Sequence, residues 1–433
     1  MPGGRFAFFA VAITAWGTAM ILARLALRNL LRQRRRTALT LMVVVAGFLA
    51  LSLAGGFMAQ TFQGLSDAAI RGGLGHLQVM PPGAMDGDEA QSLEKSMPDG
   101  DALAVRLRQD PAVAEVLPRI QFMGLLSSGP KSVAFLGTAV DPALEPKHMA
   151  SAEALKGGAM APGGAGSRWL STDPAAREVI LGVGLARALG ASIGSSLTLM
   201  STTREGALNA VDVEVAGLQD LGLRELNDRF LTVSLATANQ LLDAGPARSR
   251  LSIVLKRPQD TAAEQARLQA LLPDTSVKPW FELASFYRQV KLLYFAIFGF
   301  MGLVLFLVVL LATANTLLMS VMERVREFGV LRAMGLQPQQ LLILLQWEGA
   351  LLGLLGSVLG LSATLLLRAG LNALHLQMPA PPGTSHGYEL DIHFVPAVYF
   401  IVALGLQATI QVSALFPGLK AARLRIVEAL RHV

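Results

Sequence analysis

The stretch LLMSVMERVREFGVLRAMGLQPQQLL, residues 317–342, separates two long apolar runs with a short charged segment. Its charges alternate in sign at i,i+3 and i,i+4 spacing, so they can pair along one exposed helix. The charged positions are Glu323, Arg324, Arg326, Glu327 and Arg332. A second apolar run begins after Gly335 and Pro338. The stretch therefore predicts a turn between two membrane spans that carries a short helix.

This helix is amphipathic, because apolar residues fill the positions between its charges. They are Val325, Phe328, Val330, Leu331, Ala333 and Met334. We expect the apolar side, including Phe328 and Leu331, to press on a partner just outside the bilayer. The alternative is a solvated connector with no partner, since charge runs between spans are common.

Composition fixes the class of protein. Hydrophobic residues make up 52% of the 433 residues and charged residues 16%, and the mean hydropathy is +0.48. These values indicate a membrane protein rather than a soluble globular one. The chain has no cysteine, which excludes a disulfide framework and thiolate metal sites.

Four apolar runs predict membrane spans at residues 37–59, 287–321, 340–371 and 394–417. The first begins at Thr37, and its core of about 22 residues reaches ~33 Å as a helix, enough to cross a ~30 Å hydrocarbon layer. Residues 60–286 are polar and rich in Gly and Pro. They predict an extracytoplasmic domain between the first and second spans.

The distribution of arginine and lysine gives one consistent orientation. Six arginines lie between Arg24 and Arg36, three in the turn at 322–339 and four basic residues at 419–433, whereas the loop at 372–393 has none. Basic flanks stay in the cytoplasm. We therefore expect a cytoplasmic amphipathic elbow helix at 20–36, a cytoplasmic tail at 418–433, an external loop at 372–393 and both termini inside.

The beginning of the chain allows three interpretations. The apolar run at 6–23 resembles a signal-peptide core or a short span, but it has no convincing cleavage site. Alternatively, translation starts at Met20 and residues 1–19 are an upstream extension. We favour this third interpretation, because a cleaved signal or a full span would place the following arginines on the wrong side.

The predicted outer domain is α+β. A flexible insertion is expected at 149–173, which is rich in Gly, Ala, Ser and Pro. Alternating and apolar runs predict strands at 76–80, 132–138, 178–182, 196–201, 211–218, 229–235 and 252–256. Helical patterns occur at 101–109, 185–189, 237–242 and 262–272.

No motif argues for an enzyme, a bound cofactor, a metal site or a nucleic-acid partner. Residues 124–132 (GLLSSGPKS) nearly match a phosphate-binding loop, but Pro130 removes a backbone donor and separates the second glycine from the lysine. His375, His386 and His393 share one loop at spacings that match no usual zinc pattern, so we expect exposed histidines there.

Polar and small residues inside the spans predict helix packing. Glu348 lies about two turns into the third span; we interpret it as a structural interface residue rather than a transport relay, because no basic partner is visible in the spans. Gln407 and Gln411 lie one turn apart on the fourth span and suit an interhelical contact. A small-residue ridge on the third span should pack against a helix of this chain or of a second copy. The ridge consists of Gly349, Gly353, Gly356 and Gly360.

Residues 315–335 (NTLLMSVMERVREFGVLRAMG) resemble the signature of permeases of the macrolide-exporter, cell-division FtsX and lipoprotein-releasing superfamily of ABC transporters. The matching positions are Glu323, Arg324, Glu327, Gly329, Leu331, Arg332, Ala333 and Gly335. Residues 26–40 resemble that family's elbow, and residues 416–432 its closing tail. In the outer domain, residues 75–79 (GHLQV) and 179–199 are similar to the lipoprotein-releasing branch.

The resemblance implies the membrane subunit of an exporter whose ATPase, with its ATP and Mg, is a separate chain. The coupling helix at 322–339 would sit in a groove of that ATPase, with these residues making the contact: Glu323, Arg324, Arg326, Glu327, Phe328, Leu331, Arg332 and Gly335. Two identical or related permeases would surround a central cavity with their first and second spans. A periplasmic carrier or adaptor is a further implied partner.

The implied setting is the inner membrane, with the large domain on the periplasmic side. The implied function is extraction or export of a lipoprotein or another lipophilic substrate. Two alternatives stay open: a signalling permease that controls a cell-wall hydrolase, and a tripartite drug or peptide efflux permease. An outer domain of about 225 residues favours the first function over the cell-division branch, which is known for a smaller domain.

Overall fold

The computed structural model describes residues 24–32, 34–84, 96–148, 167–221, 224–379 and 388–423. The predicted extension at 1–19 and most of the predicted insertion, residues 149–166, lie outside the described residues. The chain divides into two compact units. The membrane unit comprises Met1–Thr61, Leu292–Leu376 and Leu390–Val433, and the outer unit comprises Phe62–Lys291 and Gln377–Glu389.

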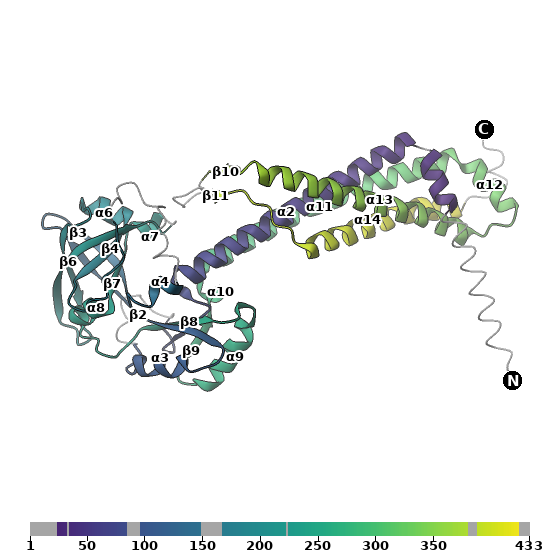
Figure 1. The fold of residues 1–433 in the computed structure, drawn as a ribbon. Helices are drawn as coiled ribbons and strands as arrows, with labels where there is room; N and C mark the ends of the chain where they lie inside the picture. The colour runs from purple at the N-terminus through teal and green to yellow at the C-terminus, as the bar shows by residue number, and fades with distance from the viewer. Residues whose placement is uncertain are drawn as a thin grey trace, which may run out of the picture. The chain divides into compact units, whose positions relative to one another are not determined.

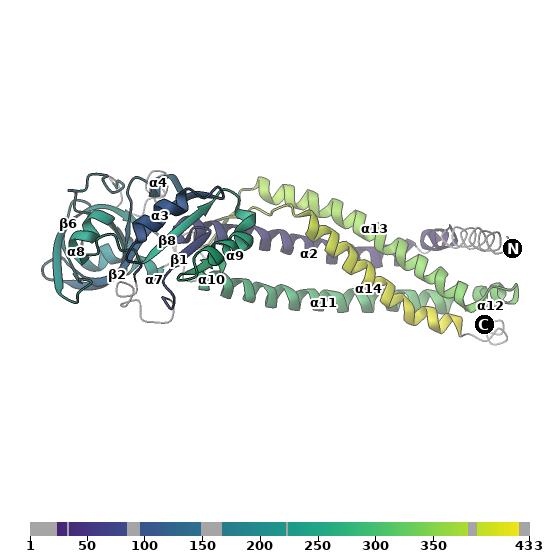
Figure 2. The ribbon, with the colours of Figure 1, turned by 90° about the horizontal axis from the view of Figure 1, so that it is seen from below.

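Within the described residues, four helices are long and apolar enough to cross a membrane, as the sequence predicts (Figures 1 and 2). They are α2 (Arg34–Ala69), α11 (Ser285–Glu323), α13 (Pro338–Ala373) and α14 (Pro396–Ala422). Both α13 and α14 have proline at the first helical position, where its missing N–H costs no hydrogen bond. Helix α2 continues past residue 59 and ends before Gly73, whose φ of 128° is not helical.

Two short helices belong to the end of the membrane unit that the sequence places in the cytoplasm. Residues 24–32 are helical and meet α2 at an angle (Figure 1); we call them the elbow. Helix α12 (Val325–Ala333) connects α11 to α13. We call α12 the coupling helix, after its position in the predicted turn.

The outer unit is built on a nine-stranded sheet in the order β3-β7-β4-β6-β5-β2-β8-β1-β9. Strands β1 and β3 to β8 lie at the seven predicted places, whereas β2 and β9 are additional. The strands are β1 (Leu77–Met80), β2 (Val113–Ser127), β3 (Ser132–Val140), β4 (Glu178–Gly182), β5 (Ser196–Thr202), β6 (Leu208–Gln219), β7 (Phe230–Ser234), β8 (Arg250–Leu255) and β9 (Ser276–Pro279). A small hairpin of β10 (Gln377–Met378) and β11 (Tyr388–Glu389) comes from the predicted external loop.

The helices of the outer unit include all four that the sequence predicts. These are α3 (Gly100–Arg108), α6 (Val183–Leu189), α8 (Leu235–Leu242) and α9 (Thr261–Leu271). Short turns of helix complete the unit: η1 (Ile70–Leu74), α4 (Glu145–His148), α7 (Arg224–Asn227), η3 (Pro258–Asp260) and α10 (Trp280–Leu283). The predicted α+β class is therefore confirmed.

Strand β2 belongs to two separate cores. Its first half pairs with β8, and its second half pairs with β3 and β5. Because β3 also pairs with β7, six strands close into a ring around one core that includes Phe122 and Phe135. The second core lies between β1, β8, β9 and the helices α3 and α9. The buried Arg119 on β2 binds the carboxylate of Glu145 in α4.

The segment that nearly matches a phosphate-binding loop forms the hairpin between β2 and β3. Gly124 is paired within β2, and Ser132 begins β3. The backbone N–H of Ser128 donates to the carbonyl of Lys131 at 2.9 Å. A phosphate loop needs backbone N–H groups that converge before a helix, so this hairpin has a different geometry.

Candidate functional site

The turn between α11 and α13 is defined by local backbone chemistry. Helix α12 ends in a Schellman motif, because Leu336 N–H donates to the Leu331 carbonyl and Gly335 N–H to the Arg332 carbonyl, both at 3.0 Å. Gly335 has a φ of 102°, which side-chain-bearing residues rarely adopt. Gln337 and Gln340 then form a capping box that starts α13.

Part of the apolar side of α12 packs inside this chain, which corrects the expectation that Phe328 and Leu331 press on a separate partner. Phe328 is only 1% exposed and Val325 only 3%. Phe328 belongs to a cluster with Leu341, Leu344 and Leu345 of α13, and Leu331 lies partly buried against the same cluster. The return of the chain through α13 therefore covers residues that the sequence analysis assigned to a contact with a separate partner.

The two glutamates of the coupling helix region pair with the elbow and the start of α2. Arg36 donates from both terminal nitrogens to both carboxylate oxygens of Glu323, one contact measuring 2.5 Å. Arg32 donates to Glu327 at 2.5 Å. Each pair joins residues nearly 300 positions apart in sequence. The charges of Glu323 and Glu327 are therefore neutralised within the same chain.

The pair of Arg32 with Glu327 shifts the pKa of both its members. A hydrogen bond to Glu327 and the attraction of its charge raise the pKa of Arg32. For Glu327, partial burial opposes ionisation, but hydrogen bonds from Arg324 and Arg32 outweigh it and lower the pKa of the carboxyl. Glu327 therefore stays ionised near neutral pH and loses its partners only in acid.

Glu348 has the basic partner that the sequence analysis failed to find within the spans. It is 2% exposed, and its Oε1 accepts from Arg324 Nη1 at 3.2 Å and from Asn29 Nδ2 at 2.6 Å. Arg324 also donates to Glu327 at 2.8 Å, and its guanidinium lies 4.9 Å from the centre of the Phe328 ring. Glu348 thus connects α13 to the elbow and to the residue that caps α12, as an interface residue.

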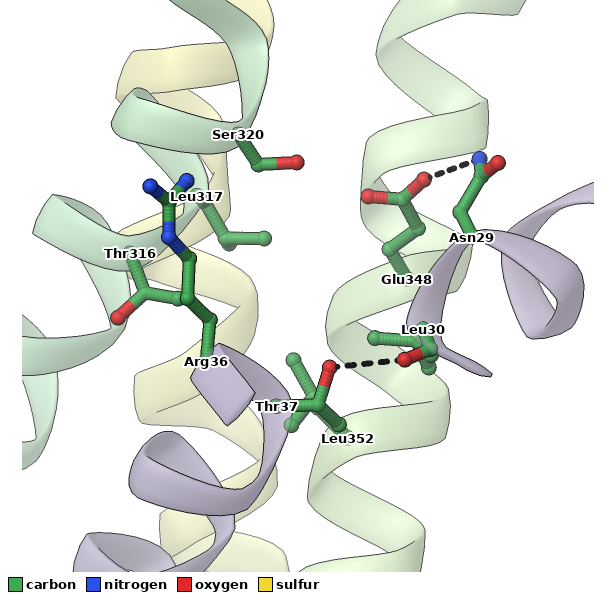
Figure 3. A pocket seen from close by; sticks show the side chains of 9 residues that line it. All are labelled: Asn29, Leu30, Arg36, Thr37, Thr316, Leu317, Ser320, Glu348 and Leu352. Carbon is green, nitrogen blue, oxygen red and sulfur yellow. Dashed lines mark hydrogen bonds between the residues drawn. The ribbon is translucent and has the colours of Figure 1, made fainter. Parts of the chain in front are cut away.

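A small cavity of about 20 Å³ lies beside Glu348, between the elbow, α2, α11 and α13 (Figure 3). Figure 3 shows Glu348 and Asn29 on one side and Arg36, Thr316 and Ser320 on the other. The Thr37 hydroxyl donates to the Leu30 carbonyl at 3.0 Å. This volume has room for one water molecule at most, and it is too small for a substrate.

The exposed surface of α12 differs from the set of contacts that the sequence predicts. Phe328 is buried, Arg324 is 6% exposed, and Arg332 donates to the Ala422 carbonyl of α14 at 3.3 Å. Val330 and Met334 are 44% and 72% exposed. Together with exposed Arg326, they repeat every four residues and form one stripe, which we call the docking face.

The glycine ridge of α13 packs against helices of this chain. A methyl group built on Gly353 would lie 2.1 Å from the end of the Gln407 side chain, and one on Gly360 would lie 2.7 Å from Phe48. Gly356 faces Val44 in the same way, at 2.5 Å. Side chains at Gly356 and Gly360 would push α13 away from α2, whereas the flexible end of Gln407 can move away from a methyl group at Gly353.

The remaining predicted packing residues also lie between α13 and α14. A methyl group on Gly349 would contact Ile410 and Ala414 at 3.4–3.5 Å. Gln411 accepts through its backbone carbonyl from the Gln346 side chain at 3.4 Å. The predicted interhelical position of both glutamines thus corresponds to the contact between α13 and α14.

Within the described residues, no cluster of three or more His, Cys, Asp or Glu could hold a metal ion. His375 is exposed, and His393 lies 3.5 Å from Asp391. His386 lies outside the described residues.

A histidine in the outer unit has a structural role that the sequence analysis missed. His76 is 8% exposed, and its Nδ1 accepts from the backbone N–H of Leu255 at 3.1 Å. Burial lowers the pKa of this imidazole, which therefore stays neutral near pH 7. His76 precedes β1 and fixes it to the end of β8.

Two family models match the chain. The FtsX-like permease C-terminal model matches residues 299–426. The MacB-like periplasmic core domain model matches residues 37–271, more than half of the chain. The FtsX-like match covers most of the predicted second span and all of the third and fourth. The MacB-like match covers the predicted first span and most of the outer domain.

Several curated relatives carry the description "Lipoprotein-releasing system transmembrane protein LolC". The protein of Neisseria meningitidis serogroup B is 26% identical over 283 residues, which cover 60% of this chain and 66% of the relative, just under two thirds. That of Xylella fastidiosa is 25% identical over 344 residues, covering 75% and 79%. A solved structure of the periplasmic region of MacB from Actinobacillus actinomycetemcomitans matches 49% of this chain and 93% of that chain at 14% identity, with a TM-score of 0.33.

Proposed function

Because the chain belongs to the MacB-like and FtsX-like permeases of ABC transporters, we propose that it is the membrane subunit of a lipoprotein-releasing complex. ATP hydrolysis in a partner chain would drive release of a lipoprotein, or another lipophilic substrate, from the inner membrane. The observation that carries the substrate class is the similarity to LolC proteins over 60–75% of the chain. The sequence GHLQV before and within β1 supports the same branch.

The docking face is our proposed contact with the ATPase. Val330 and Met334 are large apolar side chains exposed on a short helix, and Arg326 continues the same stripe. A helix that presents apolar residues at i and i+4 suits a groove on a partner protein. Phe328 and Leu331 support this face from behind, because they hold α12 against α13.

A second permease copy, or a paralogue, is our proposed partner within the membrane. In an apolar 18-residue stretch of α11, only 6% of the residues are buried within the chain, compared with 28–33% in the corresponding stretches of the other three membrane helices. Long apolar side chains along α11 therefore face either lipid or another subunit. In a dimer, the first and second spans of both copies would surround a central cavity and transmit the motion of the ATPase to the outer units.

The proposed location is the inner membrane, with the outer unit in the periplasm. The basic residues at 24–36, in the 322–339 turn and at 419–433 support this orientation, because four successive spans place the segments before the first span, between the second and third, and after the fourth on the same side of a membrane. A periplasmic carrier would then receive the released substrate at the outer unit.

Depletion of the protein in its native host tests the substrate class. Lipoproteins are labelled with radioactive palmitate, and inner and outer membranes are separated after depletion. We expect labelled lipoproteins to accumulate in the inner membrane. An unchanged distribution, together with altered cell-wall hydrolase activity or altered drug resistance, would refute lipoprotein release and support a signalling or efflux permease.

A further inference from the structure

The coupling helix has covalent connections only to α11 and α13, whereas α2 lies almost 300 residues earlier in the chain. At this end of the membrane unit, movement of α12 therefore reaches α2 through non-covalent contacts. The contacts nearest to α12 are the ion pairs of Arg32 with Glu327 and of Arg36 with Glu323.

The spacing of these pairs makes them a two-rung ladder. Arg32 and Arg36 are four residues apart, and so are Glu327 and Glu323, in the opposite direction. The two arginines lie in different helices, and so do the two glutamates. Arg32 belongs to the elbow and Arg36 to the first turn of α2, while Glu323 ends α11 and Glu327 lies in α12.

The ladder therefore holds two helix junctions against each other. A third contact lies behind it, where Glu348 of α13 accepts from Asn29 of the elbow and from Arg324, between α11 and α12. Five helical segments thus meet through charged side chains at one end of the membrane unit. Arg36 binds Glu323 with both of its terminal nitrogens, which fixes orientation as well as distance.

The exposure of the ladder argues against a role in stability. The side chains of Arg32 and Glu327 are 62% and 43% exposed, and those of Arg36 and Glu323 are 32% and 47% exposed. Ion pairs in water contribute little to folding. They do constrain which surfaces meet and at what angle, because the wrong combination of charges repels.

We propose that Arg32, Arg36, Glu323 and Glu327 form a clasp through which displacement of the coupling helix moves the first span. This inference rests on the proposed function, because it needs an ATPase that moves α12. It pairs Glu327 with the elbow and Glu323 with the start of α2, so the glutamates are positioning residues and the docking face carries the contact with the ATPase.

The test uses the full-length chain co-expressed with its ATPase and reconstituted in lipid. One variant reverses the acids (Glu323→Arg with Glu327→Arg), a second reverses the bases (Arg32→Glu with Arg36→Glu), and a third combines all four changes. Recovery of the ATPase with the permease and the substrate-stimulated part of ATP hydrolysis are measured for each.

The clasp predicts that either reversal alone keeps the ATPase bound but lowers stimulated hydrolysis by about fivefold or more, the lower range of coupling between sites. The four-residue exchange should restore most of the loss, since it recreates both pairs with opposite polarity. A matched control, Arg24→Glu with Arg28→Glu, changes two other exposed elbow arginines and should stay close to wild type.

Two results would overturn the clasp. One is a four-residue exchange that is no better than the weaker reversal. The other is loss of the ATPase on reversal of the acids alone, with no effect of reversing the bases, since the glutamates would then contact the ATPase directly. Failure of the proposed function is distinguishable, because the wild-type chain would then recover no ATPase at all.

A second measurement does not depend on how well the reversals fold. The chain has no cysteine, so Arg32→Cys with Glu327→Cys introduces the only two thiols. A short bifunctional maleimide should join them, and the joined protein should retain stimulated hydrolysis, because the clasp stays closed during the cycle. Loss of stimulated hydrolysis on cross-linking would contradict a clasp that moves as one piece.

Discussion

Replacement of Glu348 by alanine gives the sharpest test of how the coupling helix is held. Glu348 and Arg324 have side chains that are 3% and 7% exposed, and their contact distance is 3.2 Å. Removing one member of a buried ion pair leaves an uncompensated charge and costs about 3–5 kcal/mol. Arg324 keeps a second carboxylate, Glu327, at 2.8 Å. We therefore expect a loss near the lower end, about 3 kcal/mol of unfolding free energy.

Two further variants separate the charge from the hydrogen bonds. Glu348→Gln keeps an oxygen acceptor for Asn29 and Arg324, so it should cost about 1.5 kcal/mol, the lower end of the range for a hydrogen bond to a charged group. The double variant Arg324→Ala with Glu348→Ala removes both charges together. Its cost should be clearly smaller than the sum of the two single changes, because the pair interacts directly.

The assay is unfolding of the purified full-length chain in mild detergent, followed by tryptophan fluorescence across a denaturant series. Trp347 precedes Glu348 in α13 and reports on this region. A cost within about 0.5 kcal/mol for Glu348→Ala, as at an exposed position, would refute the buried interaction. Strictly additive single and double variants would refute it as well.

Three further predictions concern packing and pH. Gly360→Ala should destabilise the membrane unit by about 1–3 kcal/mol, because the new methyl group meets the rigid Phe48 side chain at 2.7 Å. Gly353→Ala is the control, since the mobile end of the Gln407 side chain can move aside. Equal losses of unfolding free energy in the two variants would contradict this packing. Phe328→Ala should cost about 3–5 kcal/mol in the same unfolding assay, and a negligible cost would show that α12 is not packed on α13. Below about pH 6.5 the unfolded chain takes up a proton at histidine more readily than the folded chain, because burial lowers the pKa of His76. The outer unit should therefore lose protection from hydrogen exchange at β1 and β8 as pH falls toward the folded pKa. The His76→Gln variant, compared at each pH, should show a weaker pH dependence, and an unchanged pH dependence would contradict this role of His76.

Apolar run length and charge asymmetry predicted the membrane spans because those properties are local. The strands that the sequence analysis found also have local signatures of alternating or β-branched residues. Strand β2 does not, because Pro118 and Arg119 interrupt it, and proline normally argues against an interior strand. Its pairing with β8 and with β3 comes from segments distant in sequence.

The candidate site was predicted in place but not in detail. The sequence identified the charged turn, yet it could not show that Glu323 and Glu327 meet arginines nearly 300 residues away. Phe328 was expected to contact the ATPase, because the packing of α13 against it is a tertiary effect that the local sequence does not show. Arg324, the basic partner of Glu348, lies just outside the spans, so the residues within the spans do not reveal it.

The most direct measurement of the central claim is recovery of the ATPase with a permease altered on the docking face. Val330→Asp with Met334→Asp places charge on two exposed positions of α12 without touching Phe328. Leu27→Asp on the elbow, 44% exposed, is the matched control. The account predicts that ATPase recovery falls by about tenfold or more for the docking-face variant, the effect of losing about 1.4 kcal/mol of binding, and stays near wild type for the control. Undiminished recovery of the ATPase with the docking-face variant would contradict α12 as the coupling site.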